Sequence, residues 1–343
     1  MKKHLVVAAG LAVLSTGAFA SKARMSAMNQ EASLGSYYMY DTRNIWRMPH
    51  TMNQNPEFVI TEWGSNDTAE GGFFNSSASL NYGLYLNADA YDSSTGGNVQ
   101  NGTTTNPQRF DLFLSSQKTS SWGARLGYET MTDTANNEEV SSFDVSVSGN
   151  LSGANVWLTY ITGADQTTSA QNDTNADMRL GATYEMNDYT VFGEYHSEGN
   201  TGDQDASTCI KVGAGKTMNM NDTATVFYDI QLMSMSNFGQ NMNGFSQDAS
   251  ELMLPVTFGV EAKATDWLTW RASLSQSLFG TFEASNGDET STKRTTLGVG
   301  ASLMYGDLQL DGTIATATNG TLGYDSAGTD DDFMSNVSMT YTF

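Results

Sequence analysis

Most of the chain is built from short segments in which apolar and polar residues alternate. In residues 143–151, for example, Phe143 and Val145 alternate with Asp144 and Ser146. Because successive side chains of a β-strand point to opposite faces, this period of two predicts strands with one apolar and one polar face. A long series of such strands indicates an all-β barrel or sandwich. The same period recurs in residues 224–232, 252–263 and 268–275.

The connections between these segments distinguish the two architectures. Short links, such as residues 152–154 and 305–307, alternate with long acidic stretches, such as residues 88–107 and 318–332. This alternation places the long loops at one end of an up-and-down meander, which is typical of a transmembrane antiparallel β-barrel. A soluble sandwich would mix loop lengths at both ends and include Greek-key crossovers. We therefore expect a transmembrane up-and-down β-barrel.

The number of strands depends on where the barrel begins. Counted from Asn81, the alternating segments give fourteen strands, an even number that returns the last strand to the side where the first began. Residues 58–63 (FVITEW) and 72–80 are weaker strand candidates, and including them raises the count to sixteen. We expect fourteen strands over residues 81–343, with sixteen as the alternative.

The N-terminal residues have the layout of a cleaved secretory signal peptide. A basic start precedes an apolar stretch over residues 5–14 and an Ala-x-Ala ending at Ala20. The apolar stretch is too short to span a bilayer, so a membrane anchor is not expected. We expect a signal peptide over residues 1–20, followed by a plug or periplasmic segment over residues 21–80.

The chain without residues 1–20 is strongly acidic. Loss of Lys2 and Lys3 leaves 14 of the 16 Lys and Arg residues against all 38 Asp and Glu residues, a net charge of −24. Such a charge excludes electrostatic attraction to nucleic acid or to anionic lipid headgroups. Acidic loops gathered over one mouth would concentrate cations there, which predicts a mild cation preference. Alternatively, the charge only keeps the cell surface solvated.

The last eight residues, NVSMTYTF, also alternate. A strand edge left bare in lipid has no hydrogen-bond partner, so the last strand is expected to pair with the first. A terminal Phe with Tyr two residues earlier resembles the C-terminal signature of bacterial outer-membrane proteins, porins among them. That resemblance implies a Gram-negative outer-membrane location and recognition by the barrel-assembly machinery. The residues that carry this signature are Val337, Met339, Tyr341 and Phe343.

If the apolar strand faces meet lipid, the polar faces line the interior. Charged residues at these positions are predicted to form cross-strand pairs on a hydrated wall or to set a constriction in a pore. The predicted lumen-lining residues are Arg109, Asp111, Arg125, Glu129, Asp144, Arg179, Glu185, Glu194, Lys211, Asp229, Glu261, Lys263, Arg271, Arg294 and Asp311.

Residues 35–49 (GSYYMYDTRNIWRMP) are too rich in aromatic residues for a solvated tail. Inside a barrel they would pack their rings and pair their arginines with lumenal carboxylates; alternatively, the segment rests against the periplasmic base. A plug before fourteen strands resembles the long-chain fatty-acid transporter family of outer-membrane barrels, as does the run from Asp41 to Pro49. The predicted plug residues are Tyr37, Tyr38, Arg43, Trp46 and Arg47.

The sequence contains no clear catalytic pattern. Only His50 and His196 follow residue 20, and His196 shares a strand face with Glu194, a pairing that can orient an imidazole. No nucleophile motif, zinc spacing or phosphate-binding glycine loop accompanies them. Cys209 is the only cysteine, so an internal disulfide is excluded despite export. We expect neither enzymatic activity nor a cofactor nor a metal.

These observations together predict a porin-like outer-membrane channel for the passive diffusion of ions and small hydrophilic solutes. Two alternatives stay open. One is a transporter of hydrophobic molecules with an N-terminal plug, and the other is a structural or surface-interaction protein. The expected partners are outer-membrane lipid, the assembly machinery and further copies of the chain, since many porins are trimers.

Overall fold

The structure is a computed structural model that describes residues 21–63, 69–88, 108–116, 122–133, 138–162, 165–166, 176–199, 206–238, 249–284, 287–320, 332–333 and 336–343. The predicted signal peptide and much of the predicted long loops lie outside these residues. Within the described ranges, no helix has the length and apolar character needed to cross a membrane.

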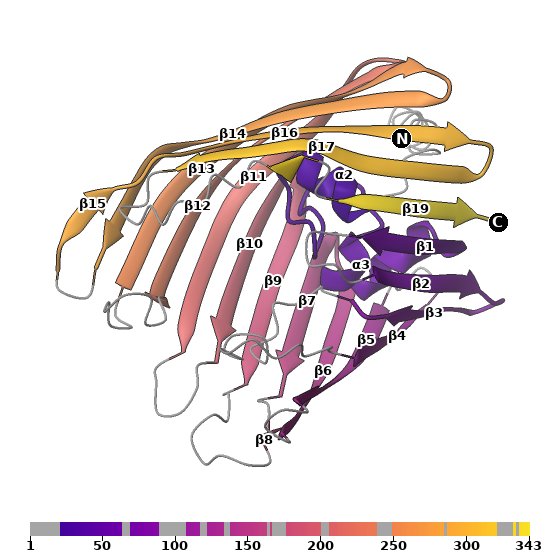
Figure 1. The fold of residues 1–343 in the computed structure, drawn as a ribbon, viewed down its shortest axis with the longest axis horizontal. Helices are drawn as coiled ribbons and strands as arrows, with labels where there is room; N and C mark the ends of the chain where they lie inside the picture. Colours follow the sequence, from indigo (N-terminus) through magenta and orange to yellow (C-terminus); the bar gives the residue numbers. More distant parts are fainter. Residues whose placement is uncertain are drawn as a thin grey trace.

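All strands of the described chain belong to one antiparallel sheet of 19 strands (Figure 1). Three of them are only two or three residues long: β8 (Asp165–Gln166), β15 (Glu289–Ser291) and β18 (Asp332–Phe333). The other sixteen follow one another in chain order around a ring. They are β1 (Phe58–Trp63), β2 (Ala69–Ser76), β3 (Leu80–Leu86), β4 (Gln108–Ser116), β5 (Trp122–Asp133), β6 (Glu138–Leu151), β7 (Ala154–Ile161), β9 (Asp177–Met186), β10 (Tyr189–Glu198), β11 (Ser207–Asn221), β12 (Ala224–Phe238), β13 (Ala249–Thr265), β14 (Leu268–Glu283), β16 (Arg294–Tyr305), β17 (Leu308–Gly320) and β19 (Val337–Thr342).

The ring closes between its first and last strands. β1 pairs with β19, with Phe58 opposite Thr342 and Trp63 opposite Val337. On its other side β1 pairs with β2, and β19 pairs with β17. The described chain is therefore a closed antiparallel barrel of sixteen strands, which confirms the alternative count. The expectation of fourteen strands beginning at Asn81 is wrong.

β1 was only a weak strand candidate because two of its three inward residues are apolar, as are two of its outward residues. Phe58 and Ile60 are buried inside the ring, whereas Val59 and Trp63 on the other face are exposed. The inward residues pack in a cluster with Trp46 and other apolar residues that precede the barrel, rather than meeting water. Apolar residues on both faces weaken the alternation by which the other strands are recognised, even though Glu62 on the inner face is charged.

Along most of the other strands the outside is mainly apolar and the inside mainly polar. In β6, Phe143 and Val147 are 42% and 45% exposed, whereas Asp144 and Ser146 between them are 1% and 0% exposed. This is the reverse of a soluble protein, in which apolar side chains are buried. The alternation in the sequence therefore correctly predicts which face of each such strand turns outward.

The last strand follows the same rule. Met339, Tyr341 and Phe343 point outward and are exposed. The ring of Phe343 stacks on that of Phe73 in β2, with ring centroids 5.9 Å apart, so the aromatic end of the chain lies across the seam of the barrel.

Residues 21–57 precede the ring, and we call them the N-terminal segment. They form α2 (Lys22–Ala27), α3 (Asn44–Arg47) and the 3₁₀-helix η1 (Pro49–Gln54). In Figure 1 these helices lie within the curve of the strands, close to β19 and β1. α2 contacts β14, β16, β17 and β19, while η1 contacts β4, β5 and β6, so the segment reaches strands on different sides of the ring.

Candidate functional site on the inner face of the barrel

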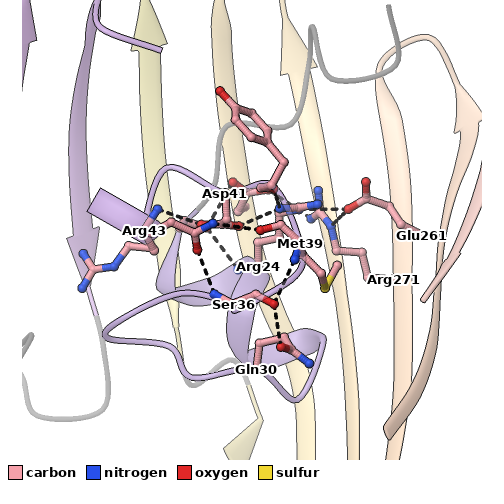
Figure 2. A network of polar contacts seen from close by, with 12 residues as sticks. Arg24, Gln30, Ser36, Met39, Asp41, Arg43, Glu261 and Arg271 are labelled. Carbon is pink, nitrogen blue, oxygen red and sulfur yellow. Dashed lines mark hydrogen bonds and ion pairs between the residues drawn. The ribbon is translucent and has the colours of Figure 1, made fainter. Parts of the chain in front are cut away.

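The first polar cluster on the inner face centres on Arg24 of α2 (Figure 2). Its Nη1 donates to Asp41 Oδ2 at 2.6 Å, and its Nε donates to Glu261 Oε2 of β13 at 3.0 Å. Arg271 of β14 also binds Glu261 and donates through Nη1 to Asp311 Oδ1 at 3.1 Å. Arg271 thus joins two other predicted lumen-lining residues, Glu261 and Asp311. Arg24, which was not predicted, ties Glu261 to Asp41 of the N-terminal segment.

A second cluster joins the segment to the first two strands. Arg43 Nη1 lies 2.8 Å from Glu62 Oε2 of β1 and 3.4 Å from Glu70 Oε1 of β2. Lys22 Nζ lies 2.8 Å from Glu70 Oε2, and the Tyr85 hydroxyl donates to Glu62 at 2.5 Å. All five side chains are buried. Two adjacent carboxylates are therefore offset by two cations from the N-terminal segment.

A third cluster joins the segment to the wall formed by β7, β9, β10 and β11. Arg47 donates through Nε to Glu194 Oε2 at 3.2 Å and through Nη2 to Glu31 Oε2 at 2.8 Å. Arg179 Nη1 lies 3.3 Å from Glu31 Oε1 and 3.5 Å from Glu194 Oε1. Lys211 Nζ lies 3.7 Å from Glu31 Oε2. Three cations and two carboxylates thus share one network.

The ion pairs of the fourth cluster join residues of the barrel wall, and the guanidinium carbon of Arg125 also lies 5.5 Å from the centre of the Trp46 ring. Arg109 donates to Asp111 Oδ1 at 2.8 Å, to Asp144 Oδ2 at 2.6 Å and to Glu129 Oε2 at 3.2 Å. Arg125 donates to Asp111 Oδ1 at 2.5 Å and also binds Asp144. These five residues were all predicted to line the lumen, and they lie across β4, β5 and β6 as cross-strand ion pairs.

The other predicted lumen-lining residues lie in different surroundings. Asp229 accepts a 2.7 Å hydrogen bond from the Tyr38 hydroxyl, and Arg294 lies 2.9 Å from Glu251 Oε2 of β13. Glu185 and Lys263 are exposed near short links. None of the contacts given above for the four clusters involves Asp229, Arg294, Glu185 or Lys263.

Two carboxyl groups of the N-terminal segment have shifted pKa values. Burial raises the pKa of Asp41 to about 6, although Arg24 and the Arg43 amide oppose that rise. At neutral pH Asp41 is therefore ionised and can pair with Arg24. Burial also opposes ionisation of Glu31, but Lys211, Arg47 and Arg179 outweigh it and hold the pKa of Glu31 well below its usual range.

Aromatic contacts complete the packing of the segment. Trp46 is fully buried, with its ring edge-on to Tyr85 and to Phe113, each with centroids 5.0 Å away. The Tyr37 ring stacks on Phe192 with centroids 4.4 Å apart. The predicted plug residues therefore all contact the inner face of the ring. The barrel residues that receive them were missed, because their apolar or aromatic side chains face inward.

Two cavities lie side by side along β10, β11 and β12. The first, about 180 Å³, lies between the N-terminal segment and the wall, where Gln30, Tyr38 and Asp229 line it; we call it the segment cavity. The second, about 230 Å³, is lined by strand residues, among them His196 and Cys209; we call it the strand cavity. Lys211 lines both, so the cavities adjoin at its side chain.

The two histidines have different environments. His50 Nδ1 lies 2.8 Å from Ser148 Oγ and its Nε2 lies 3.2 Å from Asn155 Oδ1, so its ring is fixed between strands β6 and β7. His196 lines the strand cavity. Glu194, which shares its strand face, is already bound to Arg47 and to the Trp157 indole N–H at 3.2 Å. This geometry does not pair Glu194 with His196.

No protein-family model and no curated protein sequence matches the chain. Matches among solved structures are to outer-membrane barrels, porins among them. A bacterial polysaccharide outer membrane secretin has 8% identity and a TM-score of 0.47, covering 84% of this chain and 98% of that one. A variant of the Rhodopseudomonas blastica porin has 12% identity and a TM-score of 0.35, covering 84% and 98%. OccAB3 from Acinetobacter baumannii has 10% identity and a TM-score of 0.34, covering 84% and 97%. With identities this low and TM-scores below 0.5, we draw no functional conclusion from these proteins.

Proposed function

We propose that the chain is an outer-membrane channel for ions and small hydrophilic solutes, narrowed by its N-terminal segment. The observation that carries the proposal is the pair of adjoining cavities along β10–β12, of which the segment cavity borders the N-terminal segment. Polar and charged side chains, including Lys211, Asp229 and Gln30, line that route. A charged lining opposes the passage of hydrophobic molecules, because such molecules cannot replace the water that solvates it.

The surface of the ring supports a membrane location. Its outward residues are largely apolar, and a closed ring leaves no unpaired strand edge, which is the requirement for a β-structure in lipid. Tyr341 and Phe343 lie at the end of the last strand, where aromatic side chains suit the boundary between lipid and water. Outer-membrane lipid is accordingly the proposed partner of the outer wall.

The N-terminal segment acts as a fixed plug in this proposal. Ion pairs of Arg24, Arg43 and Arg47 tie it to β13, β1 and β10, which are distributed around the ring. The buried apolar cluster of Trp46 adds packing on the side of β1–β4. Solutes would therefore pass beside the segment rather than by displacing it.

Conductance in planar bilayers tests the channel. We expect the purified protein to give small, steady current steps, and we expect a variant lacking residues 21–57 to give larger ones. The deletion must end at Glu57, because β1 begins at Phe58 and is needed to close the ring. Absence of current from both proteins in a bilayer that incorporates them would contradict the channel, while equal steps would contradict the plug.

A further inference from the structure

The strand cavity carries a set of nitrogen and sulfur donors that conduction of small solutes does not require. His196 of β10, Cys209 of β11, and Met233 and Met235 of β12 all line it. Cys209 is a free thiol and is partly accessible. Imidazole, thiol and thioether groups are the ligands that soft metal ions prefer in proteins.

The strand register brings these four residues together. His196 is the cross-strand partner of Cys209, and Cys209 is in turn the partner of Met235. Directly opposed residues of antiparallel strands have Cβ atoms about 4.5–5.5 Å apart, so the three form a row on the inward face. Met233 lies two residues from Met235 and thus on the same face. Flexible methionine side chains can bring both thioethers to an ion above Cys209.

We propose that this row is a binding site for Cu(I). Zinc sites use cysteine, histidine and carboxylate ligands, whereas thiolate together with thioether ligands selects Cu(I). Among the described residues, no group of three or more His, Cys, Asp and Glu side chains is placed to hold a metal ion. The two methionines are what complete this site. On binding, the Cys209 thiol releases its proton to solvent as the sulfur–copper bond forms, and copper keeps its oxidation state.

Charged groups of both signs surround the row. Lys211 and Glu198 line the cavity, and Arg179 is the cross-strand partner of His196. Both cations also pair with Glu31, at 3.7 Å and 3.3 Å. Because these charges are mixed, the preference for Cu(I) over Zn²⁺ depends on the thioether ligands and not on the local charge.

Competition with a chromophoric Cu(I) chelator under anaerobic conditions tests the site. The full chain in detergent micelles is expected to retain one Cu(I) per molecule, and Ag⁺ is expected to displace it, whereas Zn²⁺ is not. X-ray absorption of the copper-loaded protein should show sulfur ligands together with one imidazole. Ag⁺ should also protect Cys209 from alkylation, a measurement that needs no variant.

Two variants with a matched control assign the ligands. The double variant Met233→Leu with Met235→Leu is expected to weaken Cu(I) binding by at least about tenfold, and Cys209→Ser is expected to weaken it more. Loss of residues that only hydrogen-bond to metal ligands already lowers metal affinity by about 10–100-fold. Leucine conserves the methionine volume, so the barrel should still fold. Met178→Leu with Met186→Leu, which changes two outward methionines of β9, should bind Cu(I) normally.

Three results would overturn the proposal. They are failure of the unaltered chain to retain Cu(I), unchanged affinity in the Met233/Met235 double variant, and displacement of the metal by Zn²⁺. None of these measurements depends on conductance, so the copper site and the channel can fail separately.

Discussion

The arginines of the N-terminal segment are the residues on which its docking depends. Arg43 is buried between Glu62 and Glu70, and its guanidinium carbon lies 5.0 Å from the centre of the Trp46 ring. A buried ion pair adds little net stability, because both charges lose their hydration. Removing only one member is costly, however, since the remaining charge keeps the desolvation penalty without a partner.

Replacing Arg43 with methionine should therefore destabilise the protein strongly. We expect a loss of about 3–5 kcal/mol in the free energy of unfolding, because Glu62 and Glu70 lose one of their cations. Urea unfolding in lipid vesicles, followed by tryptophan fluorescence, measures it. The control is Lys263→Met, which removes an exposed pair with Asp266 and should cost less than about 1 kcal/mol. Equal losses in the two variants would contradict a docking role for Arg43.

The ion pairs of Glu31 are expected to weaken at low pH, which lowers the stability of the docked N-terminal segment. Burial disfavours its charge, yet Lys211, Arg47 and Arg179 together lower its pKa well below the ordinary 4.5. A carboxyl with a lowered folded-state pKa contributes stability above its unfolded-state pKa, and this is lost as pH falls toward the folded value.

We expect the stability difference between the unaltered protein and Glu31→Gln to be constant from neutral pH down to about 5 and to shrink below about 4.5. Urea unfolding at a series of pH values checks this. A difference that grew on acidification would show that the network does not favour the ionised carboxylate.

Both partners were predicted for the ion pairs of the fourth cluster and for Arg47 with Glu194. Only one partner was predicted for the pairs of Arg43 with Glu62 and of Arg24 with Glu261. Arg43 and Arg47 stand out because two arginines beside aromatic residues are unusual in a stretch before a barrel. Glu62 and Glu70 were missed because they lie in strands that were assigned to the segment. Arg24 was missed because a single basic residue in a short polar stretch carries no periodic signal.

At the scale of elements, the segment comes close to the wall where the strands carry glycine. A Cβ on Gly123 of β5 would lie 2.2 Å from the backbone nitrogen of His50 in η1. A Cβ on Gly298 of β16 would lie 2.6 Å from the carbonyl oxygen of Ala27 in α2. Backbone atoms cannot move aside as a flexible side chain can, so these positions fix how closely the helices approach the strands.

Gly123→Ala is expected to push η1 away from β5. The expected cost is about 1–3 kcal/mol of stability, the range found for overpacking in well-filled interiors. The displaced segment should also be cut faster by trypsin at Arg43 or Arg47. Gly312→Ala in β17 is the control, because a Cβ there meets nothing within 4 Å. A digestion rate for Gly123→Ala equal to that of the control would show that η1 does not depend on this approach.

At the scale of the whole molecule, the proposed route passes Lys211, where the two cavities adjoin. Removing this positive charge from a narrow path should favour cations. We expect Lys211→Met to shift the reversal potential in a KCl gradient toward greater cation selectivity than that of the unaltered protein. Lys263→Met should leave the reversal potential unchanged, since Lys263 is exposed near a short link. A shift toward anions in Lys211→Met would place the conducting path elsewhere.

Much of the architecture was predictable because almost every strand of a barrel in lipid alternates outward apolar residues with inward polar ones. Alternation identified strands such as β6 and β12 and the side of each that faces outward, and the last strand was correctly expected to pair with the first. This alternation weakens where apolar side chains, rather than water, fill the interior. Phe58 and Ile60 pack in the cluster of Trp46 instead of meeting water, so the alternation in β1 is weak, and the expected count omitted β1 and β2. The copper-binding row was equally invisible, because its members are far apart in sequence and only the register aligns them.

The seam between β1 and β19 joins residues near the two ends of the chain. Among the strand pairings of the described residues, it has the greatest sequence separation, so closing it carries a large entropic cost. Until this pairing forms, β1 and β19 each present a strand edge whose backbone hydrogen-bonding groups have no strand partner. A folding factor for such a chain would act most effectively by shielding the edges of β1 and β19 from other chains until these two strands pair with each other.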